Sequence, residues 1–353
     1  MKAILAHDPD AEIRFWGGDR MAAVGGTCVK HIRDLSFMGF VEVVRHLRQV
    51  LGNITFCKKD ILRFHPDAII YIDFPGFNLR IADFAHKNGF RNFYYISPQL
   101  WAWKKGRIRK MRRMIDRLFC ILPFEEEDFY AKNNFPQASY VGHPLLDAIA
   151  NPTGPTGPTS PTNDKPRIAL LPGSRRQELS NTMPGMLALA ARHPEYDFVI
   201  AGMNLLGDEQ YRRYGALPPN VSIRYNQTYK ILSEAYAAVV CSGTATLETA
   251  LFNVPQVVCY KANPVSIAIA RWFVGKRVRF ISLVNLIADR PIVKELLQQD
   301  FNQTMLEQEF NLITHDLSYR TTMQDGYADV RRILGGSGAS DRVASAVISS
   351  IHK

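Results

Sequence analysis

The chain of 353 residues is 46% hydrophobic and 22% charged, which is the composition of a globular protein long enough for two buried cores. Its formal net charge is +10, but eight basic side chains and one acidic side chain fall within residues 104–117, so this patch carries 7 of the 10 excess charges. Such a distribution excludes a generally basic nucleic-acid coat.

The five cysteines include no CxxC pair, which favours a reducing compartment over a disulfide framework or a structural zinc site. No apolar run reaches the roughly 18 residues of a membrane-spanning helix. The first residues lack the basic-then-apolar layout of a signal peptide. We therefore expect a cytoplasmic protein.

In chain order, the first half alternates apolar, strand-like runs with stretches of helical spacing. Residues 1–7 (MKAILAH) are typical of the end of a helix. A doubly wound domain normally opens with a strand and a tight loop before that helix, so we expect the first strand and its loop to be missing here. Strands are expected in 9–18, 66–77, 91–97 and 116–125, and helices in 39–65 and 78–89.

Residues 151–164 (NPTGPTGPTSPTND) are typical of a linker, because Pro, Gly and Thr dominate and nothing apolar interrupts them. The linker predicts an N-terminal domain over 1–150 and a C-terminal domain over 165–353, whose last helices could pack back on the first domain. In the second half, strands are expected in 167–174, 196–202, 237–243 and 255–261, with helical stretches between them. The alternation predicts two α/β, Rossmann-like domains with parallel sheets, facing across a cleft. Ligands should bind beyond the carboxyl ends of their strands.

The stretch RIALLPGSRRQEL, residues 167–179, predicts an anion site. A buried strand runs into Gly173 and Ser174, and Arg175 stands where a helix should begin. Free backbone N–H groups, a small-residue turn and an arginine together suit a phosphate. The alternative is an ordinary strand-to-helix turn with a surface arginine.

A second strand, in 237–241, runs into the small residues Ser242, Gly243 and Thr244, which would let a ligand approach the backbone. Glu248 follows on the first turns of the expected helix, where its carboxylate could bind two vicinal sugar hydroxyls. It could equally be a glutamate that is merely favourable near a helix N-terminus.

Asp73 closes the apolar run YIDFPGFN, residues 71–78, just before a Pro-Gly turn. A carboxylate at the end of a strand can act as a general base. By itself the residue fits a turn cap at least as well. No pair of histidines has metal-ligand spacing, and neither a GxxxxGK[ST] loop nor a GxSxG elbow occurs.

Two such domains with phosphate- and ribose-suited loops in the second resemble the GT-B glycosyltransferases. Several longer motifs are more specific, and they occur in the order MGFVEVVRHL, IDFPGFN, YYISPQLWAWKKGRI, ILPFE, YVGHPLLD, LLPGSRRQE, SGTATLE and SLVNLIADR. Over nearly the whole chain they resemble the lipid-A-disaccharide synthases, glycosyltransferase family 19.

The resemblance implies transfer of 2,3-diacylglucosamine from its UDP derivative to the 6-hydroxyl of 2,3-diacylglucosamine 1-phosphate, with inversion. It makes Asp73 the expected base. It also implies donor-binding roles for the residues that match the family's nucleotide-side motifs, namely Gly173, Ser174, Arg175, Ser242, Gly243, Thr244, Glu248 and Asn285. No metal and no cofactor are expected, because helix N-termini and cations can stabilise the leaving UDP.

Lipid substrates give the basic patch a role at an anionic inner-membrane surface, on the cytoplasmic side. The residues predicted to meet the membrane or the acceptor phosphate are Trp101, Trp103, Lys104, Lys105, Arg107, Arg109 and Arg112. Ile108, Met111, Ile115 and Leu118 have the spacing of one apolar helical face that could enter the headgroup region. The alternative is that this face packs on the domain core and the cations are only solvated.

The sequence departs from the family pattern in its opening helix, in its linker, and in Val284 and Asp289, where the family usually has Pro and Gly. Two other functions stay open at this point. One is a different GT-B activity on UDP-sugars, such as a transferase or an epimerase. The other is an inactive, membrane-binding relic.

Overall fold

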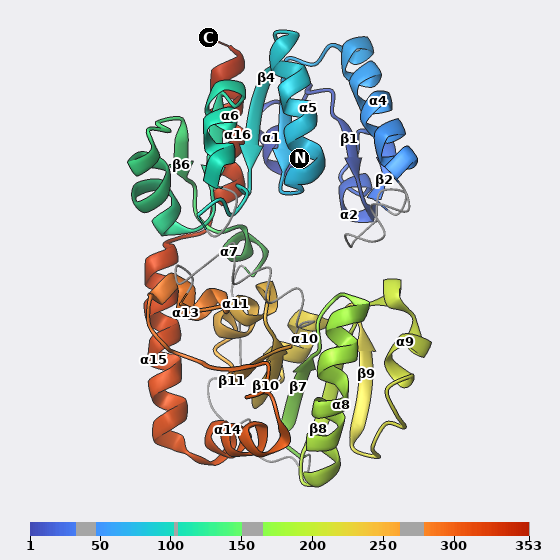
Figure 1. Cartoon of the computed structure of the whole chain (residues 1–353), viewed down its shortest axis with the longest axis vertical. Coiled ribbons are helices and arrows are strands. Elements are labelled where there is room, and N and C mark those ends of the chain that lie inside the picture. The colour runs from blue at the N-terminus through green and yellow to red at the C-terminus, as the bar shows by residue number, and fades with distance from the viewer. Residues whose placement is uncertain (33–46, 102–104, 150–164, 262–278, 353) are drawn as a thin grey trace. The chain divides into compact units, whose positions relative to one another are not determined.

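The computed structural model describes residues 1–32, 47–101, 105–149, 165–261 and 279–352 (Figure 1). The chain forms two compact units, Met1–Asp147 with Gly336–Lys353, and Ala148–Gly335. The predicted linker, 151–164, lies outside the described residues.

The first unit is built on a parallel sheet of four strands in the order β3-β4-β5-β6. These strands are β3 (Ala68–Ile72), β4 (Arg91–Tyr95), β5 (Arg117–Cys120) and β6 (Ala138–Tyr140). A separate parallel pair joins β1 (Arg14–Gly17) to β2 (Thr27–His31). The helices are α1 (Lys2–His7), α2 (Asp19–Ala22), α4 (Leu47–Phe64), α5 (Pro75–Lys87), α6 (Ile108–Met114), α7 (Pro144–Ala148) and α16 (Ala339–Ile351), and shorter turns are η2 (Lys105–Arg107), the π-helix η3 (Glu125–Tyr130) and η4 (Ala131–Asn133).

Apolar residues of this unit form one core on each face of its sheet. On one face, α4, α5 and α6 pack against Tyr71, Tyr94 and Leu118. On the other face, Val343 and Val347 of α16 pack against strand residues of β4 and β5. The last helix of the chain therefore completes the first unit, because the strands are apolar on both faces and need cover on both.

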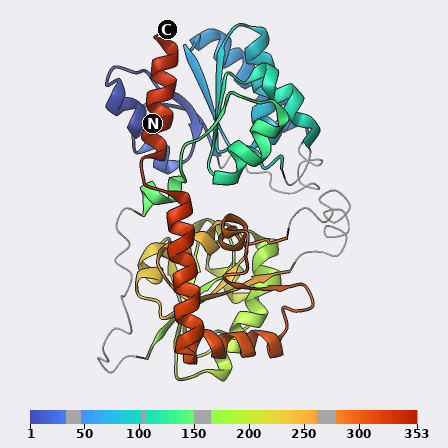
Figure 2. The same cartoon turned by 90° about the vertical axis from the view of Figure 1, so that its left-hand side faces the viewer.

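The second unit holds a parallel sheet of six strands in the order β12-β11-β10-β7-β8-β9. They are β7 (Arg167–Leu171), β8 (Asp197–Gly202), β9 (Val221–Tyr225), β10 (Ala237–Cys241), β11 (Gln256–Tyr260) and β12 (Lys294–Leu297). The helices are α8 (Arg176–Arg192), α9 (Asp208–Arg212), α10 (Thr228–Ser233), α11 (Thr244–Leu251), α13 (Leu283–Ala288), α14 (Gln303–His315) and α15 (Leu317–Leu334), with the turn η5 (Asn204–Leu206). The long α15, at the front of Figure 2, packs against α13 and α14.

The predicted α/β architecture with parallel sheets is confirmed, and each strand expected from the sequence is present. Residues 1–7 form a helix as expected, and β1 follows at Arg14. The sequence pattern does not predict β2, β6, β9 or β12. These strands are three to five residues long and lie at or near sheet edges, where partial exposure weakens the apolar signal.

The prediction of one apolar helical face over residues 108–118 is wrong. The helix α6 ends at Met114, Ile115 is extended, and Leu118 lies in β5. Ile108, Met111, Ile115 and Leu118 are all buried in the core of the first unit. The turn between helix and strand is held by Asp116, whose carboxylate accepts a hydrogen bond from the Asn92 N–H at 2.5 Å. These side chains fill the protein interior, so they cannot enter a membrane.

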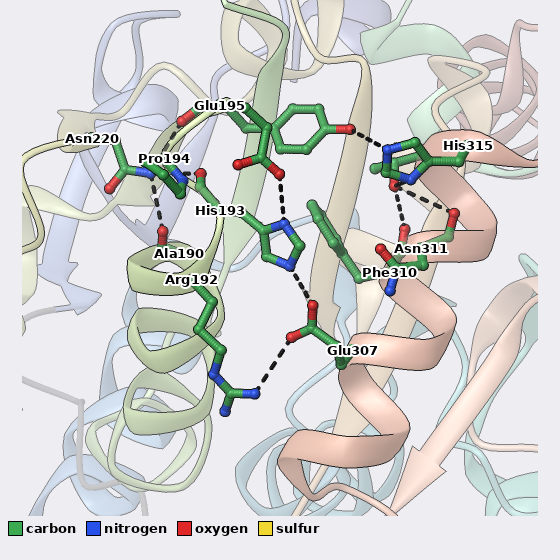
Figure 3. A network of polar contacts seen from close by, with 12 residues as sticks. Ala190, Arg192, His193, Pro194, Glu195, Asn220, Glu307, Phe310, Asn311 and His315 are labelled. Carbon is green, nitrogen blue, oxygen red and sulfur yellow. Dashed lines mark hydrogen bonds and ion pairs between the residues drawn. The ribbon is translucent and has the colours of Figure 1, made fainter.

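A buried histidine fastens α8 to α14 in the second unit (Figure 3). The His193 ring lies with Nδ1 2.8 Å from Glu195 Oε1 and Nε2 2.5 Å from Glu307 Oε1. Both ring nitrogens therefore face carboxylate oxygens. His193 follows the last residue of α8, at the opposite end of that helix from Arg175, so the cluster supports the helix rather than a ligand.

Candidate functional site

Asp73 follows β3 at the carboxyl edge of the first sheet, in an unusual backbone conformation. Asp73 and Phe74 have φ of 44° and 45°, in the left-handed region, where a non-glycine residue costs on the order of 1–3 kcal/mol. Pro75 then starts α5, with Phe74 as its N-cap residue. The Asp73 side chain is exposed and makes no hydrogen bond or ion pair within the described parts of the chain. Within the described residues it therefore does not cap the turn.

The loop after β7 lies at the carboxyl edge of the second sheet. Gly173 has φ of 107°, and a Cβ there would come within 2.6 Å of Glu178. The Glu178 carboxylate accepts hydrogen bonds from the backbone N–H groups of Ser174, at 2.8 Å, and Arg175, at 3.1 Å. An internal carboxylate thus occupies the amides that the sequence assigns to a phosphate. The Arg175 side chain is 66% exposed, and its Nη1 pairs with Glu178 Oε1 at 3.1 Å.

The loop after β10 lies beside the loop after β7, because these two strands are paired in parallel. Ser242 is anchored by its Oγ, which donates to the Ile281 carbonyl at 3.1 Å, while Gly243 and Thr244 are exposed at the start of α11. Glu248 accepts a hydrogen bond from the Tyr229 hydroxyl at 3.1 Å.

The charges of the loop after β7 also act on the end of β10. Burial raises the pKa of the Cys241 thiol, at the end of β10, to about 12; the charge of Glu178 adds to this effect and that of Arg175 opposes it. The structure therefore brings the two predicted donor loops together on one sheet edge.

Asn285 is built into the protein rather than presented on its surface. It is 1% exposed. Its Nδ2 donates to the Val293 carbonyl and to Glu295, both at 2.9 Å, and its Oδ1 accepts from the N–H groups of Ile292 and Val293. A hollow of about 390 Å³ beside β12 includes Asn285 in its wall, but not the residues after β7 and β10. The donor contact assigned to Asn285 stays a prediction.

The basic patch divides into described and undescribed parts. Trp103 and Lys104 lie outside the described residues, and the side chain of Lys105 is not described either. The exposed cations are Arg109, Lys110, Arg112, Arg113 and Arg117. Trp101 packs partly on the core, with its ring edge-on to Phe124 at 5.1 Å between centroids. Its indole is thus part of a packed cluster as well as a candidate membrane contact.

The charges of Arg107 and Asp73 both act on the Tyr94 hydroxyl. Burial and the charge of Asp73 raise the pKa of the Tyr94 hydroxyl, while Asn78 and the positive charge of Arg107 lower it.

The sequence analysis assigns no role to Glu125, although it follows β5 at the same sheet edge as Asp73. It is 1% exposed and starts the π-helix η3. Its Oε1 accepts from Ser97 Oγ at 2.9 Å, and its Oε2 accepts from the Leu122 N–H at 3.1 Å. Burial raises its pKa to about 7, against the opposing effect of these hydrogen bonds. In the sequence, the acidic run 125–128 is typical of an exposed segment. Only the tertiary contacts show that its first residue, Glu125, is buried.

Within the described ranges, no group of three or more His, Cys, Asp or Glu side chains has the geometry to hold a metal ion. The described helices also include none with the length and apolar character needed to cross a membrane.

The comparisons of amino-acid sequence agree on one family. A sequence model described as lipid-A-disaccharide synthetase matches residues 1–346. A lipid-A-disaccharide synthase of Trichlorobacter lovleyi is 34% identical, over 100% of this chain and 93% of that protein. One of Syntrophus aciditrophicus is 37% identical, over 99% and 93%. The solved structure of CalG4, the calicheamicin glycosyltransferase, has a TM-score of 0.61 at 15% identity, over 99% of this chain and 94% of that one, which supports the predicted GT-B fold.

Proposed function

Since this chain belongs to the lipid-A-disaccharide synthase family and is a glycosyltransferase of lipid A disaccharide synthesis, we propose that Asp73 is the general base of the transfer. The family implies a UDP-sugar donor and a lipid acceptor. The proposed substrates are UDP-2,3-diacylglucosamine and 2,3-diacylglucosamine 1-phosphate. The observation that carries the proposal is the exposed Asp73 carboxylate, without a partner in the described parts of the chain, beyond the end of β3.

In the proposed reaction, the Asp73 carboxylate takes the proton of the acceptor's 6-hydroxyl as that oxygen attacks C1 of the donor sugar. The O6–C1 bond forms, the bond between C1 and the diphosphate oxygen breaks, and UDP leaves with the electron pair. Attack opposite the leaving group inverts C1, so one base is enough and no covalent intermediate forms.

On the donor side, the Arg175 guanidinium is the proposed contact for the diphosphate. Glu178 holds the amides of Ser174 and Arg175 and also pairs with Arg175 Nη1 at 3.1 Å. The other, exposed N–H groups of the guanidinium, rather than the helix start, are therefore the proposed contact for the diphosphate. Gly243 and Thr244, on the adjacent loop, leave the backbone open to the nucleotide. Glu248 and Asn285 are retained as proposed donor contacts on the strength of their motifs alone.

At the membrane, the proposed contact is electrostatic. The apolar residues of α6 are buried, so the exposed cations of α6 and the start of β5 remain to meet an anionic surface on the cytoplasmic face of the inner membrane. Each cation near such a surface contributes about 1 kcal/mol. Lys110 is paired with Asp83 at 3.4 Å, and Arg112 donates to the Asn134 carbonyl. Arg109 and Arg113 have no such partner within the described ranges, which makes them the strongest candidates.

The central test is Asp73→Asn, which keeps the size of the side chain and removes its basicity. We expect kcat to fall by about 10²–10⁴-fold, with the KM for the donor within about twofold of wild type. Asp67→Asn is the matched control, because Asp67 is an exposed carboxylate just before the same strand, at its other end. A near wild-type kcat for Asp73→Asn, or an equal loss in the control, would remove Asp73 from the role of base.

A further inference from the structure

The Asp73–Phe74 turn is held by two side chains from different elements. The Asp73 carbonyl oxygen accepts one hydrogen bond from the Tyr94 hydroxyl at 2.6 Å and another from Asn78 Nδ2 at 2.7 Å. Asn78 Nδ2 also donates to the Ile72 carbonyl at 3.2 Å. The Asp73 N–H donates to the Tyr95 carbonyl at 3.2 Å. Tyr94 lies on β4 and Asn78 in the first turns of α5, so both the sheet and the helix hold the same peptide unit.

Two consecutive non-glycine residues in the left-handed region persist only where the surroundings over-determine them. Rotating the 73–74 peptide back toward an extended or right-handed conformation would turn the Asp73 carbonyl away from both donors. Leaving the left-handed region also requires the φ of Asp73 to change sign, which moves its Cα–Cβ bond relative to β3 and redirects the exposed carboxylate. The contacts that hold the carbonyl oxygen therefore also determine where the carboxylate points.

We propose that Tyr94 and Asn78 are positioning residues that hold the Asp73 carboxylate in its reactive orientation. The inference rests on the proposed role of Asp73 as the base. Tyr94 is fully buried, and its raised pKa keeps the hydroxyl protonated as a donor. Neither side chain needs to touch the substrate, because each acts through the backbone of Asp73. A base placed by its backbone needs no side-chain hydrogen bond, which would lower its basicity.

The same sheet provides two matched controls. The Tyr95 side chain, on the next residue of β4, is buried in the core on the other face of the sheet from Tyr94. The Tyr71 hydroxyl, on β3, donates to Asn92 Oδ1 at 2.9 Å within the core, and not to the Asp73 turn. Replacing each tyrosine by Phe therefore compares three losses in one sheet. Tyr94 loses a hydroxyl that holds the Asp73 carbonyl, Tyr95 loses one on the other face of the sheet, and Tyr71 loses one that makes a hydrogen bond within the core.

The experiment measures kcat, the KM for each substrate and the thermal midpoint for the full chain. Tyr94→Phe is expected to lower kcat about 10-fold or more, with the donor KM within about twofold. Tyr95→Phe and Tyr71→Phe should keep kcat within about twofold, even where Tyr71→Phe lowers the thermal midpoint. Asn78→Ala, at a partly exposed position, should lower kcat in the same way, and serves if Tyr94→Phe fails to fold.

Non-additivity separates this inference from the function that it rests on. In an Asp73→Asn background, Tyr94→Phe should cause no further loss of the residual rate. The reason is that Tyr94 and Asn78 then position a side chain that is no longer a base. If Asp73→Asn is inactive but Tyr94→Phe and Asn78→Ala both match wild type, the positioning role of Tyr94 and Asn78 is refuted, whereas the role of Asp73 as base is supported. A multiplicative loss in the double variant would also refute the positioning role, since Tyr94 would then act independently of Asp73. If Asp73→Asn itself is active, both the role of Asp73 as base and the positioning role of Tyr94 and Asn78 are refuted.

Discussion

Removing the charge of Glu125 should make the first unit less sensitive to pH. Burial raises the pKa of this carboxyl from its ordinary 4.5 to about 7 in the folded protein. Each unit of difference between the folded and unfolded pKa corresponds to about 1.4 kcal/mol. The free energy of unfolding is therefore lower by up to about 3 kcal/mol once Glu125 ionises. Glu125→Gln keeps the shape and an acceptor for Ser97 but never ionises.

The sign follows from proton binding. Between pH 4.5 and about 7 the folded state keeps the Glu125 proton while the unfolded chain releases it, so the free energy of unfolding falls as pH rises. Below pH 4.5 both states hold the proton and the difference vanishes, whereas above about 7 the full loss is present. Burial lowers the pKa of His143 to about 4, so His143 acts in the opposite sense and removes stability as pH falls from 6.5 to about 4. The difference between wild type and variant cancels the His143 contribution.

The assay is urea unfolding of both proteins from pH 5 to pH 8. Tryptophan fluorescence suits it, because Trp16, Trp101 and Trp103 belong to the first unit and only Trp272 belongs to the second. We expect Glu125→Gln to gain up to about 3 kcal/mol relative to wild type across this range, with most of the gain below pH 7. If the free energies of unfolding of wild type and Glu125→Gln differ by the same amount at every pH, Glu125 does not titrate in this window.

Two further changes test the donor loop and the cationic surface. Arg175→Ala should weaken UDP binding by about 1.5–3 kcal/mol in calorimetry, through loss of a charge-assisted contact, whereas Arg176→Ala, at the adjacent exposed arginine, should not; equal affinities for both variants would contradict the assignment. Reversal of Arg109 and Arg113 to Glu should reduce co-sedimentation with anionic vesicles, and wild-type binding should itself weaken as salt rises, because charge attraction is screened within about 8–10 Å. Reversal of Lys230 and Arg213 in the second unit is the control, and the membrane proposal fails if wild type and both variants pellet alike.

The amino-acid sequence by itself determines most of the secondary structure and the location of the candidate residues. Apolar strands alternating with helices leave few options besides parallel sheets covered on both faces, since strands of that composition must be buried on both sides. Strand ends can be read from the first turn residue after an apolar run, which places Asp73, Arg175 and Ser242 at carboxyl edges without any knowledge of the fold. The family motifs add the reaction to these positions.

Only the tertiary structure decides what covers each apolar surface and which polar groups are already occupied. The spacing of Ile108, Met111 and Ile115 predicts that one side of the segment is removed from water. Burial in a membrane and burial in a protein core are equally consistent with that spacing. Glu178 reads as a surface residue and instead occupies the amides of the donor loop, and Asn285 is saturated by backbone partners. The hydroxyl that holds the Asp73 turn comes from Tyr94, 21 residues further along the chain, and reaches it because β3 and β4 are neighbours. Contacts between residues distant in sequence depend on strand order, and local periodicity contains no information about that order.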